Sequence, residues 1–223
     1  MERSILHLDL DTFFVECERR ENPKLENRPV LVGGTGSRGI VSACSYEARR
    51  YGIHSGMSMP VARRMCPEAV SIKGNSGTYT KYSKLVTDII RDEVPLFEKS
   101  SIDEFYVDLT GMDRFFGNYR FAKELRNKIV DNSGLPISFG LSQNKLVSKV
   151  ATGEAKPNNQ MQIDLGFEKK FLAPLVIRKI PAIGKVSAAR LRDLGVHRVK
   201  SLQEMPKEVL HSVLGKNGIL IWD

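Results

Sequence analysis

Two acidic clusters in this 223-residue sequence have the residue types and the spacing of a divalent-cation site. Asp9 and Asp11 close an apolar segment near the N-terminus, and Asp103 and Glu104 follow a pair of serines. Mg²⁺ prefers hard oxygen ligands and keeps part of its water shell, so a few carboxylates and substrate phosphates complete its coordination. A pair of such ions can hold an attacking and a leaving oxygen in line. The two clusters therefore predict a carboxylate site for two Mg²⁺ ions.

Each acidic cluster belongs to a segment with the pattern of a buried strand. Residues 4–11 are rich in apolar side chains, and a period of two puts Asp9 and Asp11 on one face. Residues 97–109 predict a hairpin with the serines in its turn. Adjacent acids in a regular strand point to opposite faces, whereas a turn lets both reach one cation. Acidic turns are common on solvated surfaces, but two on buried strands favour a metal site, because buried charges are normally paired or metal-bound.

Three further groups suit the oxygens of a triphosphate, although each also has an ordinary interpretation as a packing or surface residue. Tyr46 and Arg49 lie three residues apart and share a helix face, and a guanidinium beside a phenol hydroxyl matches phosphate oxygens. Lys156 follows a helix and precedes a proline, where it can act as a point charge for phosphate. Phe13 and Phe14 follow the first acidic cluster, so one of them could form a floor under a sugar.

A second, independent pattern lies at residues 180–196, which predict a hairpin turn and a helix that ends at Gly195. The pattern resembles a helix-hairpin-helix. A Gly in the turn lets backbone N–H groups approach a DNA phosphate, and the helix N-terminus adds a favourable dipole. An ordinary helical hairpin is the alternative. The residues expected to bind DNA are Ile183, Gly184, Lys185, Val186 and Ser187.

The composition indicates a globular protein with a polyanionic partner. A net charge of +8 fits nucleic acid, although charge alone does not distinguish such a protein from a merely basic one. The cysteines, at positions 17, 44 and 66, form no C-x-x-C pair and predict neither a disulfide framework nor a zinc site. There is no apolar run of membrane-spanning length and no signal-peptide pattern, so we expect a cytoplasmic protein without a membrane partner.

The alternation of strands and helices up to residue 163 predicts an α+β fold, a mixed sheet with helices on one face. The glycine-rich residues 33–39 lack the Lys-Ser/Thr ending of a phosphate-binding loop and predict a turn. Residues 164–223 are short helical runs broken by Pro and Gly, so we place a domain boundary near Asp164. Further strands are expected at residues 29–33, 39–44 and 137–141, and helices at 12–20, 45–51, 60–65, 79–94, 119–132 and 144–152.

Five motifs in this order resemble those of the Y-family translesion DNA polymerases, most closely the bacterial DNA polymerase IV type. They are Asp9-Leu10-Asp11-Thr12-Phe13-Phe14, Tyr46-Glu47-Ala48-Arg49, Ser101-Ile102-Asp103-Glu104, Gly140-Leu141-Ser142-Gln143-Asn144-Lys145 and Ala155-Lys156-Pro157-Asn158. The resemblance covers essentially the whole chain. It implies a palm of residues 1–10 and 76–163, small fingers of residues 11–75, and a helical thumb of residues 164–223 that carries the helix-hairpin-helix.

The resemblance also implies the roles of the site residues. Asp9, Asp103 and Glu104 match the family's catalytic metal-binding carboxylates, and the carbonyl of Leu10 matches its backbone ligand. Phe14 matches the steric gate, an aromatic side chain that clashes with the 2′-hydroxyl of a ribonucleotide. The residues expected on the incoming nucleotide are Thr12, Phe13, Phe14, Tyr46, Arg49 and Lys156.

Three positions depart from the family pattern. Ala43 stands where Thr is common, Ala182 replaces the first Gly of the hairpin, and Asn159 stands where Gly is usual. Past Asp223 the family continues into a little finger domain and a sliding-clamp peptide. We therefore expect a catalytic core that lacks both, either as an excised fragment or as a short gene product.

These features predict low-fidelity, template-directed DNA synthesis past lesions, in which a nucleotide passes from a dNTP to a primer 3′-hydroxyl. The expected partners are primer-template DNA and dNTP, the expected state is a monomer, and a sliding clamp would bind through the missing C-terminal region. Two alternatives remain open. A nucleotidyl-cyclase-like palm enzyme would share the acidic residues and need no DNA, and a catalytically weak DNA-binding fragment would bind primer-template without extending it.

Overall fold

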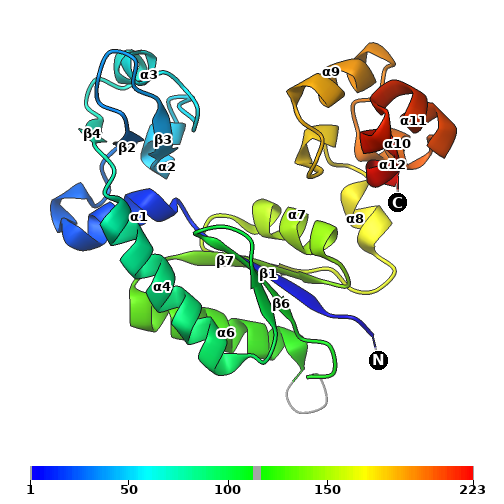
Figure 1. Cartoon of the computed structure of the whole chain (residues 1–223), viewed down its shortest axis with the longest axis horizontal. Coiled ribbons are helices and arrows are strands. Elements are labelled where there is room, and N and C mark those ends of the chain that lie inside the picture. The colour runs from blue at the N-terminus through cyan, green and yellow to red at the C-terminus, as the bar shows by residue number, and fades with distance from the viewer. Residues whose placement is uncertain (1, 113–116, 223) are drawn as a thin grey trace.

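The chain folds into three units that together have the outline of a U (Figure 1). The computed structural model describes residues 2–112 and 117–222. A central sheet with its helices forms the base of the U. A small sheet unit rises from one end of the base, and a C-terminal helical unit rises from the other.

The central sheet has five strands, with the N-terminal strand in the middle. Their order is β5 (Phe97–Lys99), β6 (Glu104–Asp108), β1 (Ile5–Leu10), β7 (Ile137–Ser142) and β8 (Gln160–Gln162). β7 and β8 are parallel, and the other neighbours are antiparallel. The register places Asp9 opposite Glu104 on one side and opposite Ser138 on the other. The hairpin expected at residues 97–109 is confirmed.

Helices cover both faces of this sheet (Figure 1). α4 (Ser76–Glu93) and α6 (Asn118–Ser133) cover one face, and α7 (Lys145–Ala155) lies on the other, toward which His7 points. The α+β class and the mixed sheet are as expected, but the position of α7 differs from the expectation that helices cover one face. Alternation along β1 gives each face its own partner. The residues of β1 buried with α4 and α6 are Leu6, Leu8 and Leu10.

The contact between α7 and the sheet depends on Gly140 of β7. A Cβ at this position would lie 2.1 Å from the carbonyl oxygen of Ser148 and 2.6 Å from the backbone nitrogen of Thr152. These distances are too short for a side chain of any size, so the glycine lets the helix lie directly on the strand. The same packing brings Lys149 of α7 close to Glu104, and Lys156, which directly follows α7, close to Asp9.

The small unit is a second sheet, in the order β3 (Val41–Cys44), β2 (Val30–Gly33) and β4 (Val70–Ile72), with α2 (Tyr46–Arg49) and α3 (Met59–Met65). α1 (Phe13–Glu21) and η1 (Pro23–Leu25) connect it to the base. The buried Arg19 of α1 bonds Glu16, the carbonyls of Leu25 and Arg28, and Glu47 of α2. This guanidinium therefore fixes α2 relative to α1.

The C-terminal unit is helical and shares its core with α7. It contains α8 (Glu168–Leu172), η2 (Ile177–Lys179), α9 (Lys185–Asp193), α10 (Val199–Gln203), α11 (Lys207–Leu214) and α12 (Lys216–Trp222). Val147 and Val150 of α7 belong to the same buried cluster as Ile180 and Leu191. The hairpin predicted before α9 is present, and a single 3₁₀ turn, η2, precedes it.

Most elements begin and end within a few residues of the expected positions. The helix expected at 12–20 is α1, and the helix expected at 144–152 is α7, which continues to Ala155. β4 and β8 were not expected, because three residues are too few to show a period. In the two described ranges, no helix combines the length and the apolar character needed to cross a membrane.

We expect Gly140→Ala to lower the free energy of unfolding by about 2 kcal/mol, because the added methyl group pushes α7 away from β7. Urea denaturation measures the change. The control is Gly153→Ala in α7. Apart from atoms of its own helix, a Cβ at this position would have no heavy atom of the described residues within 4 Å. This control should leave stability unchanged or raise it by up to about 1 kcal/mol. Equal losses in the two variants would contradict a role for close packing at Gly140.

Candidate active site

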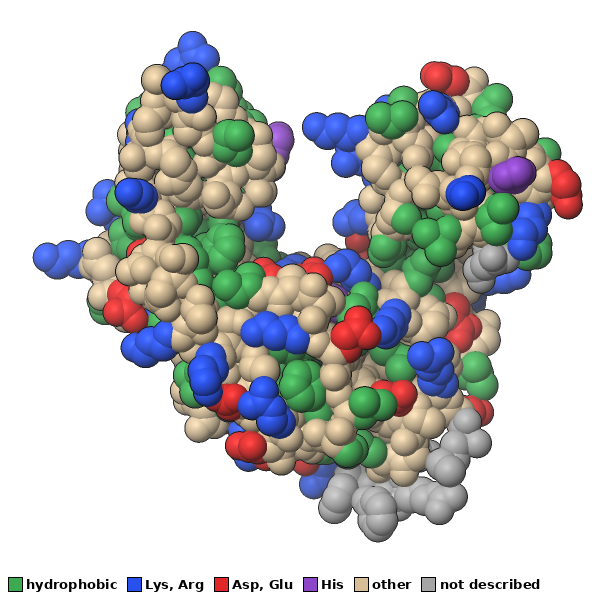
Figure 2. Space-filling model, in the orientation of Figure 1, with side chains coloured by type: hydrophobic (Ala, Val, Ile, Leu, Met, Phe, Trp, Pro, Cys, Tyr) green, Lys and Arg blue, Asp and Glu red, His purple; other side chains and the backbone are tan. Residues whose placement is uncertain are grey.

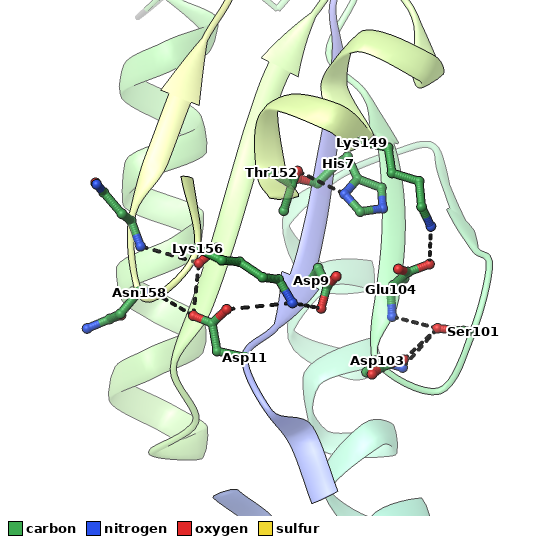
Figure 3. A network of polar contacts seen from close by, with 12 residues as sticks. His7, Asp9, Asp11, Ser101, Asp103, Glu104, Lys149, Thr152, Lys156 and Asn158 are labelled. Carbon is green, nitrogen blue, oxygen red and sulfur yellow. Dashed lines mark hydrogen bonds and ion pairs between the residues drawn. The ribbon is translucent and has the colours of Figure 1, made fainter. Parts of the chain in front are cut away.

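The carboxylates predicted to bind metal lie together at the end of β1. Asp9 faces Glu104 across the β1/β6 pair, and Asp103 precedes Glu104 in the hairpin turn. The hydroxyl of Ser101 donates to Oδ1 of Asp103 at 2.6 Å and accepts from the backbone N–H of Glu104 at 3.1 Å (Figure 3). The backbone N–H of Leu10 donates to the carbonyl of Asp103 at 3.1 Å. The serine turn thus holds both acids beside Asp9, as predicted.

Two ammonium groups contact these carboxylates. Nζ of Lys156 lies 2.6 Å from Oδ1 of Asp9 and 3.6 Å from Oδ1 of Asp11. Nζ of Lys149 lies 2.7 Å from Oε2 of Glu104. Both lysines approach from the α7 side of the sheet (Figure 3). The acidic side chains are therefore partly neutralised by the protein itself.

Burial and neighbouring charges shift the pKa values of Asp9 and Glu104 in opposite directions. Burial raises the pKa of Asp9 to about 6, although the charge of Lys156 opposes this change. Burial also favours the protonated form of Glu104, but the hydrogen bond and charge of Lys149 outweigh it and hold the pKa of Glu104 below its usual value. Burial lowers the pKa of His7 to about 3, so this imidazole is neutral. Asp9 is therefore the carboxyl whose ionisation depends most on a nearby cation.

Asp11 has a different role from Asp9, although a regular strand would put both on one face. β1 ends at Leu10, and Thr12 has a φ of 41°, so the chain turns directly after Asp11. The buried Oδ2 of Asp11 accepts from the hydroxyl of Ser138 at 2.9 Å and from the backbone N–H of Asn158 at 2.6 Å. Asp11 thereby anchors the segment that carries Lys156.

The donor set fits a hard divalent cation. Asp9, Asp103 and Glu104 offer carboxylate oxygens, two of which already contact ammonium cations. Across the described residues, no group of three or more His, Cys, Asp and Glu side chains has the arrangement of a formed metal site. The side chains therefore have the chemistry of a Mg²⁺ site, and a bound cation would have to replace the ammonium contacts.

Tyr46 and Arg49 lie together on α2, as their spacing predicted. Cζ of Arg49 is 4.8 Å from the centre of the Tyr46 ring. The Tyr46 hydroxyl is buried and has no hydrogen-bond partner among the described residues. Burial, with the nearby charge of Asp11, raises the pKa of this phenol, so the hydroxyl stays protonated and can donate. An unpaired buried donor of this kind is suited to a ligand oxygen.

The structure separates the two aromatic residues that follow Asp11 and Thr12. Phe13 is buried in the main core, which is the ordinary role of such a residue. Phe14 is half-buried and stacks on Tyr79, with ring centroids 4.5 Å apart. Tyr79 is itself held by Glu18, whose carboxylate accepts from the phenol at 2.6 Å. Of the two, only Phe14 is thus partly accessible and supported from behind by another ring.

The predicted DNA-binding residues lie at the hairpin and the start of α9. Ile183 is buried in the C-terminal core, and Gly184, Lys185 and Val186 are exposed. Ala182 has a φ of 70°, the left-handed conformation that favours glycine. This conformation explains why the family pattern has Gly at this position. Ser187 is half-buried in the first turn of α9.

A pocket of about 300 Å³ joins the hairpin to the carboxylates. The space between the two upper units is open, with acidic and basic side chains together at its floor (Figure 2). Basic side chains of the C-terminal unit project into this space. The residues around the pocket include Asp9, Lys149, Lys156, Arg178, Lys179 and Pro181.

The sequence patterns did not identify Lys149 or His7 as residues of the site. Lys149 lies seven residues before Lys156, a spacing that approximates two helical turns and could have placed both lysines on one side of α7. His7 lies two residues before Asp9 on the same strand face, and its Nδ1 is 2.9 Å from Oγ1 of Thr152. Of the departures from the family pattern, Asn159 lies between Lys156 and β8, where its backbone N–H donates to the hydroxyl of Ser138.

Residues 8–153 match the model of the impB/mucB/samB family, and this range holds all the carboxylates described above. The chain belongs to the impB/mucB/samB family. It is 40% identical over 215 residues to the DNA polymerase IV of Dehalococcoides mccartyi, an alignment that covers 96% of this chain and 55% of that relative. The predicted resemblance to Y-family polymerases is confirmed.

Two solved structures of this family have the same fold. DinB from Sulfolobus solfataricus matches with a TM-score of 0.89 and 28% identity, over 97% of this chain and 64% of that one. An insertion ternary complex of Dbh DNA polymerase matches with a TM-score of 0.89 and 27% identity, over 97% of this chain and 65% of that one. The chain therefore spans between about half and two thirds of the length of these family members.

We expect Mn²⁺ affinity to fall about tenfold between about pH 7 and about pH 5, since a carboxyl must lose its proton to bind a cation. The pKa of Asp9 is raised to about 6, so the ionised form dominates above this pH and is lost below it. Electron paramagnetic resonance of free Mn²⁺ measures the affinity. Lys156→Met should move the midpoint to higher pH, because it removes the charge that favours ionised Asp9. An affinity that stays constant over this range would contradict the assignment.

Proposed function

We propose that this chain is the catalytic core of a low-fidelity, template-directed DNA polymerase that copies past lesions. The observation that carries the proposal is the pairing of Asp9 with Glu104 across the sheet, with Asp103 in the adjoining turn. Asp9 of this acidic group lines the same pocket as Ile180 and Pro181 of the C-terminal unit. The names of the relatives, DNA polymerase IV and Dbh DNA polymerase, support the same conclusion.

In the proposed mechanism the carboxylates Asp9, Asp103 and Glu104 and the Leu10 carbonyl hold two Mg²⁺ ions. Bound Mg²⁺ supplies a lowered pKa for the primer 3′-hydroxyl and charge compensation for the triphosphate. The Tyr46 hydroxyl, which lacks a partner among the described residues, donates to a phosphate oxygen. The 3′-hydroxyl then attacks the α-phosphorus of the dNTP, and pyrophosphate leaves.

Arg49 and Lys156 supply positive charge to the triphosphate in this mechanism. Arg49 is exposed beside the Tyr46 ring, so its guanidinium is free to form paired contacts with phosphate oxygens. Lys156 contacts Asp9 and Asp11, and its ammonium would turn to a phosphate oxygen when a cation binds Asp9. Thr12 and Phe13 would contact the nucleotide through their backbone at the start of α1, and Phe14 would lie under the sugar.

We assign the three units to the polymerase domains. Residues 1–10 and 76–163 form the palm, residues 11–75 the fingers and residues 164–223 the thumb. The central sheet and its helices support the palm assignment, and the exposed hairpin residues 184–186 support a thumb that holds primer-template DNA by its phosphates. The short fingers leave little protein over the new base pair, which favours lesion tolerance.

We expect Glu104→Ala to reduce primer extension in Mg²⁺ by at least about a hundredfold, because it removes a ligand that acts on the reacting oxygens. The matched control is Glu98→Ala, which removes another lysine-paired glutamate of the same hairpin, and this variant should keep activity. Binding of primer-template without extension by the wild type would favour the binding-fragment alternative. Conversion of nucleotide without primer-template would favour the cyclase-like alternative.

We expect Phe14→Ala to increase ribonucleotide incorporation relative to deoxyribonucleotide by at least about tenfold, because it removes the clash with the 2′-hydroxyl. Phe14→Tyr keeps the ring and should keep the preference for deoxyribonucleotides. Single-nucleotide insertion kinetics with dNTP and rNTP measure the ratio. The same sugar preference in wild type and Phe14→Ala would remove Phe14 from the gate role.

A further inference from the structure

We propose that Lys149 is a positioning residue that competes with the catalytic cation for Glu104. In the metal-free site its ammonium holds the Glu104 carboxylate, and cation binding displaces it. The inference rests on the proposed function, because it takes Glu104 to be a metal ligand. None of the sequence motifs assigns a role to Lys149.

The contact between Lys149 and Glu104 is direct and partly shielded from water. Nζ of Lys149 lies 2.7 Å from Oε2 of Glu104, and the two side chains are 36% and 22% exposed. Figure 3 shows the Lys149 chain reaching down from α7 to Glu104, on the other side of Asp9 from Lys156. The ammonium occupies one lone pair of the carboxylate and its charge repels a dication that approaches the same group, so the two cations compete for Glu104.

The two lysines pair with two of the three acids. Lys156 contacts Asp9, Lys149 contacts Glu104, and Asp103 accepts a bond from the neutral hydroxyl of Ser101. Among the described residues no ammonium or guanidinium group pairs with Asp103. A cation that enters therefore meets Asp103 without an ionic competitor, whereas at Glu104 it meets the positive charge of Lys149.

The backbone under Lys149 is rigid, whereas its side chain is not. α7 is fixed against β7 by the close approach at Gly140, so the helix cannot follow a displaced side chain. Lys149 also lines the pocket of about 300 Å³ beside α7, so a displaced ammonium has space there.

The test is Mn²⁺ binding to the whole chain without DNA or nucleotide, followed by electron paramagnetic resonance. We expect the Kd of Lys149→Met for Mn²⁺ to be about three to five times lower than that of the wild type. A partly exposed ion pair such as Lys149–Glu104 is weak, so its loss changes the binding equilibrium only by such a factor. Lys149→Arg keeps the positive charge and should restore the weaker wild-type affinity.

The matched control is Lys145→Met. Lys145 lies one turn earlier in α7 and pairs with Glu98 of the same hairpin, which is not among the proposed metal ligands. This variant should bind Mn²⁺ as the wild type does. Urea denaturation of each variant shows whether the helix is intact, so a general loss of structure is recognised.

The outcomes separate this inference from the proposed function. Equal Mn²⁺ affinity in wild type and Lys149→Met, with weaker binding in Glu104→Gln, overturns the role of Lys149 and keeps the metal site. An equal gain in Lys145→Met and Lys149→Met also overturns it, since any loss of positive charge would then suffice. Binding that is unaffected by Glu104→Gln removes Glu104 from the metal site and overturns both.

Discussion

Mutual repulsion among three closely spaced carboxylates is the constraint that the surrounding structure has to satisfy. Asp9 and Glu104 face each other across a strand pair, and Asp103 adjoins them in the turn. Burial is the main cause of the raised pKa of Asp9, and the charges of Glu104 and Asp103 add to it. Lys149 and Lys156 offset part of this cost by their contacts with Glu104 and Asp9.

Helix α7 supplies this compensation, and its position depends on one residue of the sheet. Gly140 has no side chain, so α7 lies directly on β7 and reaches the carboxylates with Lys149, while Lys156 follows its last turn. The opposite side of the same helix contributes Val147 and Val150 to the core of the C-terminal unit. A single helix thus connects the acidic site with the unit proposed to hold DNA.

The nucleotide side of the site depends on a different buried charge. Arg19 is held by Glu16, Glu47 and two carbonyls, so its guanidinium has partners despite its burial. These bonds join α1, which carries Phe14, to α2, which carries Tyr46 and Arg49. The proposed steric gate and these two proposed phosphate-binding residues therefore share one support. Loosening that support would disturb sugar selection and phosphate binding together.

The sequence by itself determined most of the elements and the family. The alternation in residues 4–11, the serine turn before Asp103 and the pairing of Tyr46 with Arg49 are local, because each depends on neighbours within a few residues. The ordered motifs were sufficient to indicate the polymerase family, which the comparisons confirm. Element ends near residues 12–20 and 144–152 also follow from local pattern.

Only the tertiary structure decided how these elements meet. It placed α7 on the opposite face from α4 and α6, separated Asp11 from Asp9, and paired Lys149 with Glu104. The position of α7 and the pairing of Lys149 with Glu104 depend on strand register and on the absence of a side chain at Gly140, whereas Asp11 is held by the distant Ser138 and Asn158. Long-range register and close packing have no local period, so the sequence alone could not fix them.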